Sequence, residues 1–318
     1  MIGIKVPVFV VNGFLESGKT VFAMDTIEDE YFSDGEDTLI IACEEGMEEY
    51  DEGLLARHGA QVIYCESKEE FTEEFLKEAQ RKYKPSQILL EYNGMWGMEL
   101  LNTVKKPRGW FRAQQVTMVD ATTFDMYMQN MKSLFMDMCR ESDMVIFNRC
   151  VEGTEAASYK RNIRAVNPRA TVAFEMEDGM PFEFEEEMPF DVNADVIEIE
   201  EADYGIWYID AMDHPEKYEG KTVKFKGMVY RPKGMPLDQF VPGRMAMTCC
   251  ADDTAFIGYI CEGVKESYQT KDWVILTASV SVEEREEYEG ETAVVLHAKE
   301  IVKTEPAAEE SLCISNNL

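Results

Sequence analysis

One short stretch of the chain has the residue types and the spacing of a phosphate-binding loop. Residues 11–20 read VNGFLESGKT, in which Gly13 is followed by four residues and then by Gly-Lys-Thr. Glycines let successive backbone N–H groups turn inward around an anion, and a helix after the loop adds its positive N-terminal end. Lys19 then supplies charge to the β- and γ-phosphates, and the Thr20 hydroxyl ligates Mg²⁺. The loop predicts a nucleoside triphosphate site.

The context of this loop supports the same interpretation, because it follows the apolar run IKVPVFV and precedes a helical stretch. We expect six loop residues to contact the nucleotide: Gly13, Glu16, Ser17, Gly18, Lys19 and Thr20. Glu16 is unusual among them, since it brings a carboxylate near phosphates. Either this carboxylate points away from the ligand or it meets a cation.

Two acids and a glycine follow apolar runs further along the chain. Glu91 lies at the end of QILLEY, Gly94 follows three residues later, and Asp120 ends QVTMVD. Ligands of open α/β sheets bind at the carboxyl ends of the strands. We therefore expect Glu91 to hold Mg²⁺ through its water shell, Gly94 to sense a γ-phosphate, and Asp120 to serve catalysis with Lys19 and Glu91. Each acid alone could equally be a helix cap or an exposed strand end.

The run MVIFNRC places Asn148 and Arg149 at another strand end. In GTP-binding proteins a strand followed by Asn-Lys-x-Asp supplies the guanine contacts, and the aspartate accepts two N–H donors from the base. Here arginine replaces lysine, Val151 stands where the aspartate is expected, and Glu152 lies one residue too far. We expect Asn148 and Arg149 to contact the nucleotide, whereas the choice between GTP and ATP stays open.

The first 175 residues alternate short β-branched runs with amphipathic stretches. The runs expected to be strands are residues 6–12, 38–43, 61–65, 87–92, 115–120, 144–148 and 171–175. Strands that alternate with helices form βαβ units and a sheet covered on both faces. Residues 1–175 are therefore predicted to be an α/β nucleotide-binding domain of the P-loop NTPase type with a mostly parallel sheet.

The pattern changes after an acidic stretch, which we interpret as a linker over residues 176–200. Beyond it, one helical segment precedes five strand-like runs separated by Gly, Pro and acidic turns. Five strands in so short a span suggest a small all-β barrel of the oligonucleotide-binding (OB) type over residues 201–303. Residues 304–318 are expected to be a disordered tail.

The composition excludes several classes of protein. The chain of 318 residues holds 62 acidic against 31 basic residues, a formal charge of −31. This charge argues against nucleic acid as a partner, because a phosphate backbone needs a basic surface. No apolar run approaches the length of a membrane span, and the N-terminus lacks the features of a signal peptide. Eight cysteines are too sparse for a secreted disulfide scaffold, so a reduced, cytoplasmic protein is expected.

Three cysteines of the C-terminal part invite a metal site. Cys249, Cys250 and Cys261 could hold Zn²⁺ or Cu⁺, because soft thiolates favour these ions. Adjacent residues of a straight strand face opposite ways, so a bulge or strand end would be needed to bring the first two sulfurs to one ion. Buried free thiols are the other interpretation.

Four segments in this order resemble the CobW/HypB/UreG class of P-loop GTPases, and most closely its CobW-like branch. They are VNGFLESGKT, EYNGMW, VTMVDATTF and SDMVIFNRC with VNPRATV, and the similarity covers about residues 5–175. The resemblance implies Mg²⁺-dependent hydrolysis of GTP or ATP that is coupled to metal delivery or cofactor assembly, with a metal-receiving protein as partner. Of the branch's Cys-x-Cys-Cys metal motif, only Cys65 is present.

The C-terminal part resembles a second group, the C-terminal domain of the YcgQ-like proteins that accompany a membrane permease. The similarity covers about residues 215–303 and is carried by FVPGRMAMTCC and the following GYIC. It implies a fold and a permease as a further partner.

Two other functions remain open. A P-loop kinase of small molecules would need a basic lid, for which KKPRGWFR at residues 105–112 is the candidate in the first domain. A scaffold protein could instead hold nucleotide without turnover.

Overall fold

The chain forms two structural units, each built around its own sheet. The computed structural model describes residues 5–33, 37–44, 46–184, 188–247, 254–285, 292–309 and 311–313. One unit comprises Met1–Ala156 and Val166–Phe184, and the other comprises Ala157–Ala165 and Glu185–Leu318. Each unit is treated by itself below.

The sheet of the first unit is parallel throughout, with the strand order β3-β2-β4-β1-β5-β6-β7. Its strands are β1 (Val6–Gly13), β2 (Thr38–Ala42), β3 (Ala60–Tyr64), β4 (Gln87–Glu91), β5 (Trp110–Asp120), β6 (Met144–Asn148) and β7 (Thr171–Phe174). All five positions of β2 and of β4 are buried, as expected for strands covered on both faces. The structure confirms the predicted α/β fold with its parallel sheet.

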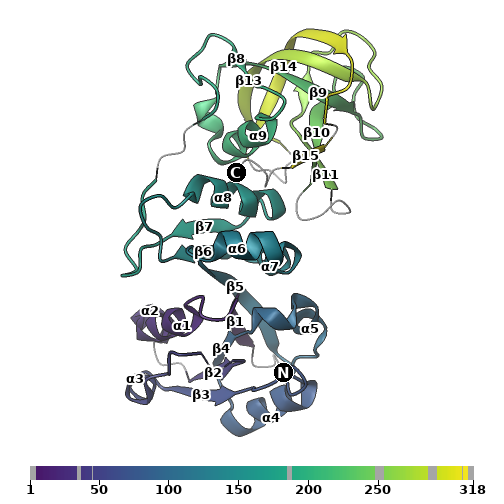
Figure 1. The fold of residues 1–318 in the computed structure, drawn as a ribbon. Coiled ribbons are helices and arrows are strands. Elements are labelled where there is room, and N and C mark those ends of the chain that lie inside the picture. The colour runs from purple at the N-terminus through teal and green to yellow at the C-terminus, as the bar shows by residue number, and fades with distance from the viewer. Residues whose placement is uncertain are drawn as a thin grey trace. The chain divides into compact units, whose positions relative to one another are not determined.

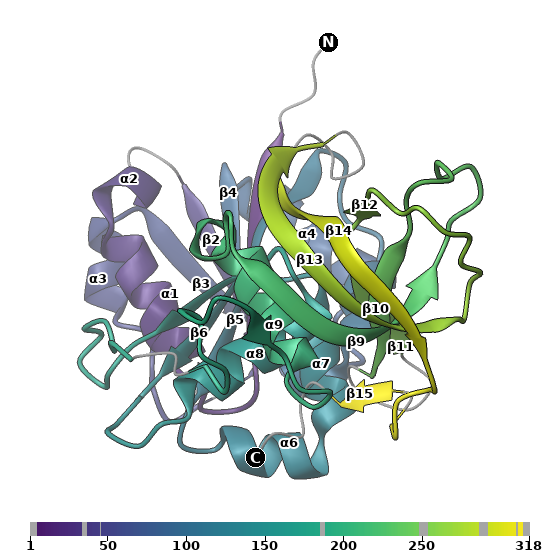
Figure 2. The same ribbon diagram turned by 90° about the horizontal axis from the view of Figure 1, so that it is seen from above.

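Helices connect these strands and cover both faces of the sheet. They are α1 (Lys19–Glu28), α2 (Glu30–Ser33), α3 (Glu52–Arg57), α4 (Glu73–Tyr83), η1 (Gly94–Trp96), α5 (Met98–Thr103), α6 (Phe124–Asn130) and α7 (Lys132–Arg140). The helix α8 (Ala156–Val166) follows β6 in the chain, and its residues 157–165 belong to the second unit. Parallel strands need crossover connections, and these are nearly always right-handed. The connections from β1 to β2 and β3 move towards one end of the sheet, and those from β3 through β4 to β6 move towards the other end. Right-handed crossovers in these two directions place their helices on opposite faces of the sheet. Accordingly α1, α2 and α3 lie on one side, and α4 and α7 lie on the other (Figures 1 and 2).

The strand order brings distant parts of the chain to one edge of this sheet. Because the strands are parallel, their carboxyl ends share that edge. Val11 of β1 pairs with Glu91 at the end of β4, and Asp120 at the end of β5 pairs with Asn148 at the end of β6. The loop that follows β1 thus has Glu91 on one side and Asp120 and Asn148 on the other.

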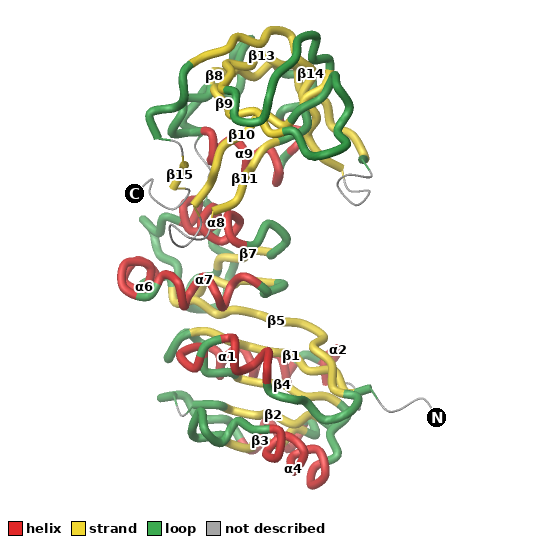
Figure 3. Tube along the Cα trace, turned by 90° about the vertical axis from the view of Figure 1, so that its right-hand side faces the viewer, coloured by secondary structure: helices red, strands yellow, loops and turns green. Residues whose placement is uncertain are grey.

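The second unit is a curled, mostly antiparallel sheet (Figure 3). Its strands are β8 (Ile197–Glu198), β9 (Thr222–Tyr230), β10 (Val241–Met247), β11 (Thr254–Gly258), β12 (Cys261–Glu262), β13 (Trp273–Glu284), β14 (Thr292–Thr304) and β15 (Ser311–Cys313). They are preceded or interrupted by α9 (Tyr204–Asp213) and η2 (Pro215–Lys217). The fully buried Trp207 of α9 packs its ring on Phe225 and Tyr259, with centroids 5.0 and 5.6 Å away. This confirms a separate, mostly β C-terminal part, whereas its assignment to the OB type stays a prediction.

The end of the chain differs from the expectation of a disordered tail over residues 304–318. Ser311–Cys313 forms β15, which pairs in parallel with residues 245–247 of β10. The reason lies in β10 itself, because β9 pairs only with its first three residues, 241–243. The backbone of residues 245–247 therefore has an open edge, which a further strand can occupy.

Candidate functional site

The loop between β1 and α1 needs glycine at two positions. Gly13 has φ +145° and Gly18 has φ +89°, and a Cβ atom would collide with the Met118 carbonyl at the first and with the Asn148 amide at the second. Gly18 caps α1 without a side-chain hydrogen bond. The first backbone N–H groups of α1 therefore keep the capacity to bind an anion.

Lys19 is buried in the site, and its ammonium group already has hydrogen-bond and ion-pair partners. The residue is 2% exposed, and Nζ donates a 2.6 Å hydrogen bond to the Phe14 carbonyl of the loop. Nζ also forms an ion pair with Glu44, which follows β2. This glutamate is the contact that the sequence reasoning missed. Its position after an apolar run, like that of Glu91, is the signal that could have found it.

Thr20 and Glu91 meet across the edge of the sheet. Thr20 Oγ1 donates a 2.9 Å hydrogen bond to Glu91 Oε1, and the Tyr50 hydroxyl donates to Glu91 Oε2. Burial raises the pKa of Glu91, although the hydrogen bond from Tyr50 and the charge of Lys19 oppose this shift. The pKa of Tyr50 is also raised, first by its burial and then by the charge of Glu91. No feature of the sequence indicated Tyr50.

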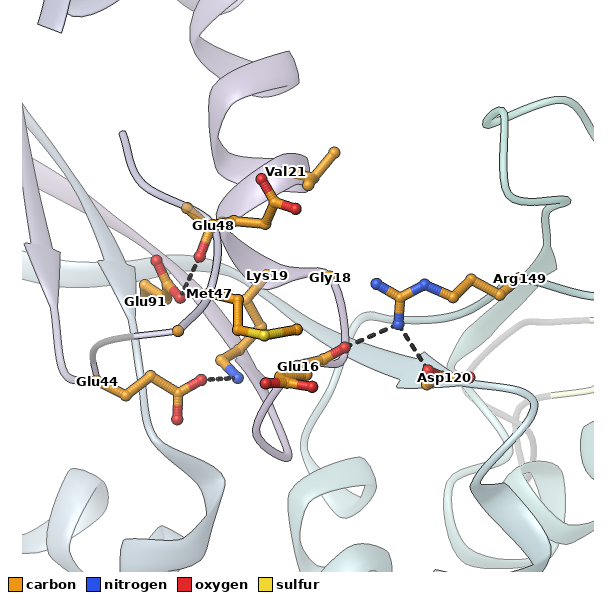
Figure 4. A pocket seen from close by; sticks show the side chains of 12 residues that line it. Glu16, Gly18, Lys19, Val21, Glu44, Met47, Glu48, Glu91, Asp120 and Arg149 are labelled. Atoms are coloured by element: carbon orange, nitrogen blue, oxygen red, sulfur yellow. Dashed lines mark hydrogen bonds and ion pairs between the residues drawn. The ribbon is translucent and has the colours of Figure 1, made fainter. Parts of the chain in front are cut away.

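These groups open into a cavity of about 300 Å³. Five acids line it, namely Glu16, Glu44, Glu48, Glu91 and Asp120. Two basic residues, Lys19 and Arg149, line it from opposite sides of the loop (Figure 4). Carboxylate oxygens are the ligands that Mg²⁺ uses in proteins, together with water and substrate phosphates. The lining therefore suits a triphosphate that arrives with a divalent cation.

Arg149 connects the loop between β1 and α1 to the end of β5 through two hydrogen bonds. Its Nη1 atom donates to the Glu16 carbonyl at 2.8 Å and to Asp120 Oδ2 at 2.6 Å. Asp120 Oδ1 accepts from the Thr122 N–H and hydroxyl at 2.9 and 2.6 Å. Both Glu16 and Arg149 have positive φ values, +60° and +54°, which non-glycine residues seldom adopt. This contact holds the loop in a strained backbone conformation.

Other predicted site residues lie close by but outside this cavity. Asn148 donates to the Ser17 carbonyl at 2.8 Å and lines a second cavity. Gly94 packs under the loop, where a Cβ atom would come within 2.8 Å of the Gly13 carbonyl oxygen. None of residues 105–112, the candidate kinase lid, is among the residues that line either described cavity.

The predicted cysteine site is only partly within the described residues. Cys249 and Cys250 lie outside them. Cys261 is fully buried in β12, and its burial raises the pKa of its thiol to about 12. Across the ranges that the structure describes, no group of three or more His, Cys, Asp or Glu side chains is arranged to hold a metal ion. Within the same ranges, no helix combines the length and apolar character needed to cross a membrane.

Comparison with known proteins finds similar solved structures. Among solved structures, the HypB hydrogenase maturation factor of Archaeoglobus fulgidus is 16% identical, covering 56% of this chain and 84% of its own, with a TM-score of 0.40. The Zn(II)-bound YjiA GTPase of E. coli is 12% identical, covering 86% of this chain and 94% of its own, with a TM-score of 0.42. The curated proteins contain no match.

Family comparison covers nearly the whole chain. Residues 176–310 match the DUF1980 C-terminal domain. Residues 7–174, more than half of the chain, match the CobW/HypB/UreG nucleotide-binding domain. The chain therefore belongs to the CobW/HypB/UreG family of nucleotide-binding proteins.

Proposed function

We propose that this protein hydrolyses a nucleoside triphosphate, GTP or ATP, with Mg²⁺ at the cavity beside α1. The observation that carries the proposal is the 2.9 Å hydrogen bond between Thr20 Oγ1 and Glu91 Oε1, next to the buried Lys19. Family membership supports nucleotide binding. The geometry adds the hydroxyl, the carboxylate and the lysine that phosphoryl transfer requires.

The residues present suit Mg²⁺. The Thr20 hydroxyl would bind the ion, and the Glu91 carboxylate would hold its water shell. The bound ion would neutralise charge that develops on the phosphate oxygens. Lys19 and the loop N–H groups would orient the β- and γ-phosphates.

Asp120 is proposed to complete the catalytic set. Its carboxylate is oriented by Arg149 and Thr122, at the end of a strand adjacent to the loop. We propose that nucleotide state changes the segments around residues 91–96 and Asp120, because both border the phosphate cavity or the loop.

Coupling of turnover to metal or cofactor handling is the further part of the proposal. It is supported by membership of the CobW/HypB/UreG family. The client would be a metal-receiving protein or a permease. Because Cys249 and Cys250 lie outside the described residues, the metal-binding residues are left to experiment.

The experiment measures phosphate release from GTP and from ATP, with Mg²⁺ and with a chelator, for the unmodified chain and for Thr20→Ala. Thr26→Ala is the matched control, because Thr26 lies on the same helix and its hydroxyl donates to the Phe22 carbonyl at 2.7 Å. We expect Mg²⁺-dependent release that Thr20→Ala removes and Thr26→Ala keeps.

Two outcomes would replace hydrolysis by another function. Nucleotide binding without phosphate release would favour the scaffold interpretation. Phosphoryl transfer to an added small molecule, with little release to water, would favour the kinase. The lining of the cavity argues against the kinase, because its candidate basic lid contributes nothing to either described cavity.

A further inference from the structure

A second cavity, of about 370 Å³, adjoins the phosphate cavity. Gly18, Val21, Glu48 and Arg149 line both, so a ligand held at the loop can extend from one into the other. Val21, Phe22 and Met118 give the second cavity apolar surface, which suits the faces of a flat ring. This is the place where the base of a nucleotide would lie.

Asn148 is among the residues that line this cavity, and it carries a hydrogen-bond acceptor without a partner in the part of the chain that the structure describes. Its Nδ2 atom is occupied by the Ser17 carbonyl. Its Oδ1 atom is buried and has no hydrogen-bond partner among the described residues. A buried acceptor without a partner costs free energy, which a ligand N–H group would recover.

The residue that the sequence motif assigns to base recognition does not reach this cavity. Val151 is 61% exposed, and its N–H donates to Thr154 Oγ1 at 3.0 Å in a turn. Neither Val151 nor the exposed Glu152 is among the residues that line the two cavities. The carboxylate that a guanine base needs must come from elsewhere.

Glu175 lies directly beside Asn148 at the edge of the sheet. Phe147 pairs with Phe174, so the next residues of β6 and β7 are neighbours. The Glu175 N–H donates to the Phe147 carbonyl at 2.8 Å, and its carbonyl accepts from the Cys150 N–H at 2.9 Å. These bonds fix the backbone of Glu175, which is among the residues that line the cavity.

The Glu175 carboxylate is also available. It has no hydrogen-bond or ion-pair partner within the part of the chain that the structure describes. Partial burial and the charge of Asp25 raise its pKa. Other acids at this cavity, among them Glu177 and Asp178, are exposed. Glu175 is thus a half-buried acceptor next to a second acceptor, Asn148 Oδ1.

We propose that Glu175 is the specificity-determining residue of the base site, accepting the N1–H and N2–H donors of guanine in place of the carboxylate missing at position 151. This inference rests on the proposed function. Guanine offers two adjacent donors to a carboxylate. Adenine offers its N6 amino group beside the N1 lone pair, which would face a carboxylate oxygen and be repelled.

The first test needs no variant. The dissociation constant between the protein and a nucleotide is measured, in the presence of Mg²⁺, for GTP, ATP and inosine triphosphate. Inosine triphosphate differs from GTP in lacking the N2 amino group. Loss of one hydrogen bond to a charged acceptor should weaken inosine triphosphate about 10- to 100-fold relative to GTP. Equal affinity for the three nucleotides would overturn the inference.

The second test changes the chemistry of the acceptor with Glu175→Gln, and Glu177→Gln serves as the matched control on the same cavity. The glutamine amide would donate to the C2 carbonyl of xanthine. In Glu175→Gln, the affinity for GTP should therefore fall about 10-fold or more, and the affinity for xanthosine triphosphate should rise about 10-fold or more. A gain of binding cannot arise from unfolding. If the ratio of GTP affinity to xanthosine triphosphate affinity is the same in Glu175→Gln as in Glu177→Gln, the inference is wrong.

The two proposals fail in different ways. If the unmodified chain binds none of these nucleotides, the proposed function falls and the inference falls with it. If all of them bind equally and Lys19→Ala removes them all, the nucleotide site stands and only the role of Glu175 is lost.

Discussion

Lys19 and Glu44 form an ion pair in which the two side chains are only 1% and 7% exposed. The lysine that would meet a phosphate is thus paired with a carboxylate. Glu44 Oε2 is buried and lacks a hydrogen-bond partner among the described residues. The pair is thus incompletely satisfied, and a phosphate would compete with Glu44 for the same charge.

Lys19→Ala should abolish nucleotide binding and also destabilise the fold. Affinity should fall about 100-fold or more, because a buried charge contact to the phosphates is lost. Since the substitution leaves the Glu44 charge uncompensated, unfolding free energy should fall by about 3 kcal/mol. Urea unfolding and nucleotide titration measure the two effects. Addition of Glu44→Gln should restore stability without restoring affinity, and recovered affinity would contradict the role of Lys19.

Glu44→Gln alone should tighten nucleotide binding by about 10-fold. The substitution removes the anion that competes with phosphate, and a change of about 1.4 kcal/mol is modest for a buried ion pair. Calorimetric titration with a non-hydrolysable triphosphate measures it. Glu48→Gln is the control, because Glu48 lines the same cavity but is exposed. Weaker binding in Glu44→Gln would show instead that Glu44 takes part in holding the cation.

The Mg²⁺-dependent part of nucleotide affinity should decrease as the pH falls. Burial raises the pKa of Glu91 above its ordinary value of 4.5. An acid with a raised pKa is protonated at a higher pH than usual, and the protonated form holds a cation poorly. The loss should therefore begin above the range in which an ordinary glutamate titrates. Titrations across pH with Mg²⁺ and with chelator measure this, and an identical pH profile in Glu91→Gln would refute the assignment.

The raised pKa of Glu91 has a second consequence, for the nucleotide-free fold. Because the folded-state pKa lies above the unfolded one, the folded state binds the proton more tightly, and this group lowers the stability of the fold at high pH. As the pH falls, the loss of stability starts to be recovered at the folded-state pKa and is fully recovered below the unfolded-state pKa. The free energy of unfolding of the unmodified chain should therefore vary with pH between the unfolded-state and folded-state pKa values of Glu91. In Glu91→Gln this part of the pH dependence should be absent. Thermal unfolding of both proteins across that window measures it.

Val151→Asp should leave base preference unchanged, although it restores the sequence motif. Val151 is exposed in a turn and does not line the described cavities. The ratio of GTP to ATP affinity should therefore stay within about twofold of the unmodified chain, and below the ~10⁴ that a polar pocket can reach. A large rise in this ratio would show that the turn at 151 folds over the base.

Cys261→Ser should weaken the fold without changing any response to Zn²⁺. The thiol is fully buried, and burying a hydroxyl there without a partner should cost about 1–3 kcal/mol. Its raised pKa disfavours the thiolate that would bind a metal. Thermal unfolding of the full chain with and without Zn²⁺ should show the same zinc-dependent change in Tm for both proteins, although the variant starts from a lower Tm. A zinc-induced stabilisation that disappears in Cys261→Ser would contradict this expectation.

Local patterns were sufficient to predict the sheet of the first unit and its phosphate loop. Apolar runs such as QILLE became buried strands, and the glycines of the loop occupy positions where a Cβ atom would collide. Glu44 and Tyr50 were not predicted, because their contacts depend on β2 lying next to β4. The short strand β15 was missed for the same kind of reason, since it forms on an edge that β9 leaves open.

Arg149 lines both cavities while its guanidinium is bound to Glu16 and Asp120. A triphosphate brings negative charge to this guanidinium, whereas a nucleoside alone does not. The two halves of a nucleotide should therefore bind non-additively, because only the phosphates can displace a residue that also borders the base. Joining two fragments saves translational and rotational freedom in any protein, so the deviation from additivity for guanosine, inorganic triphosphate and GTP has to be compared between the unmodified chain and Arg149→Ala. The change in this deviation measures what it costs to release Arg149 from its contacts.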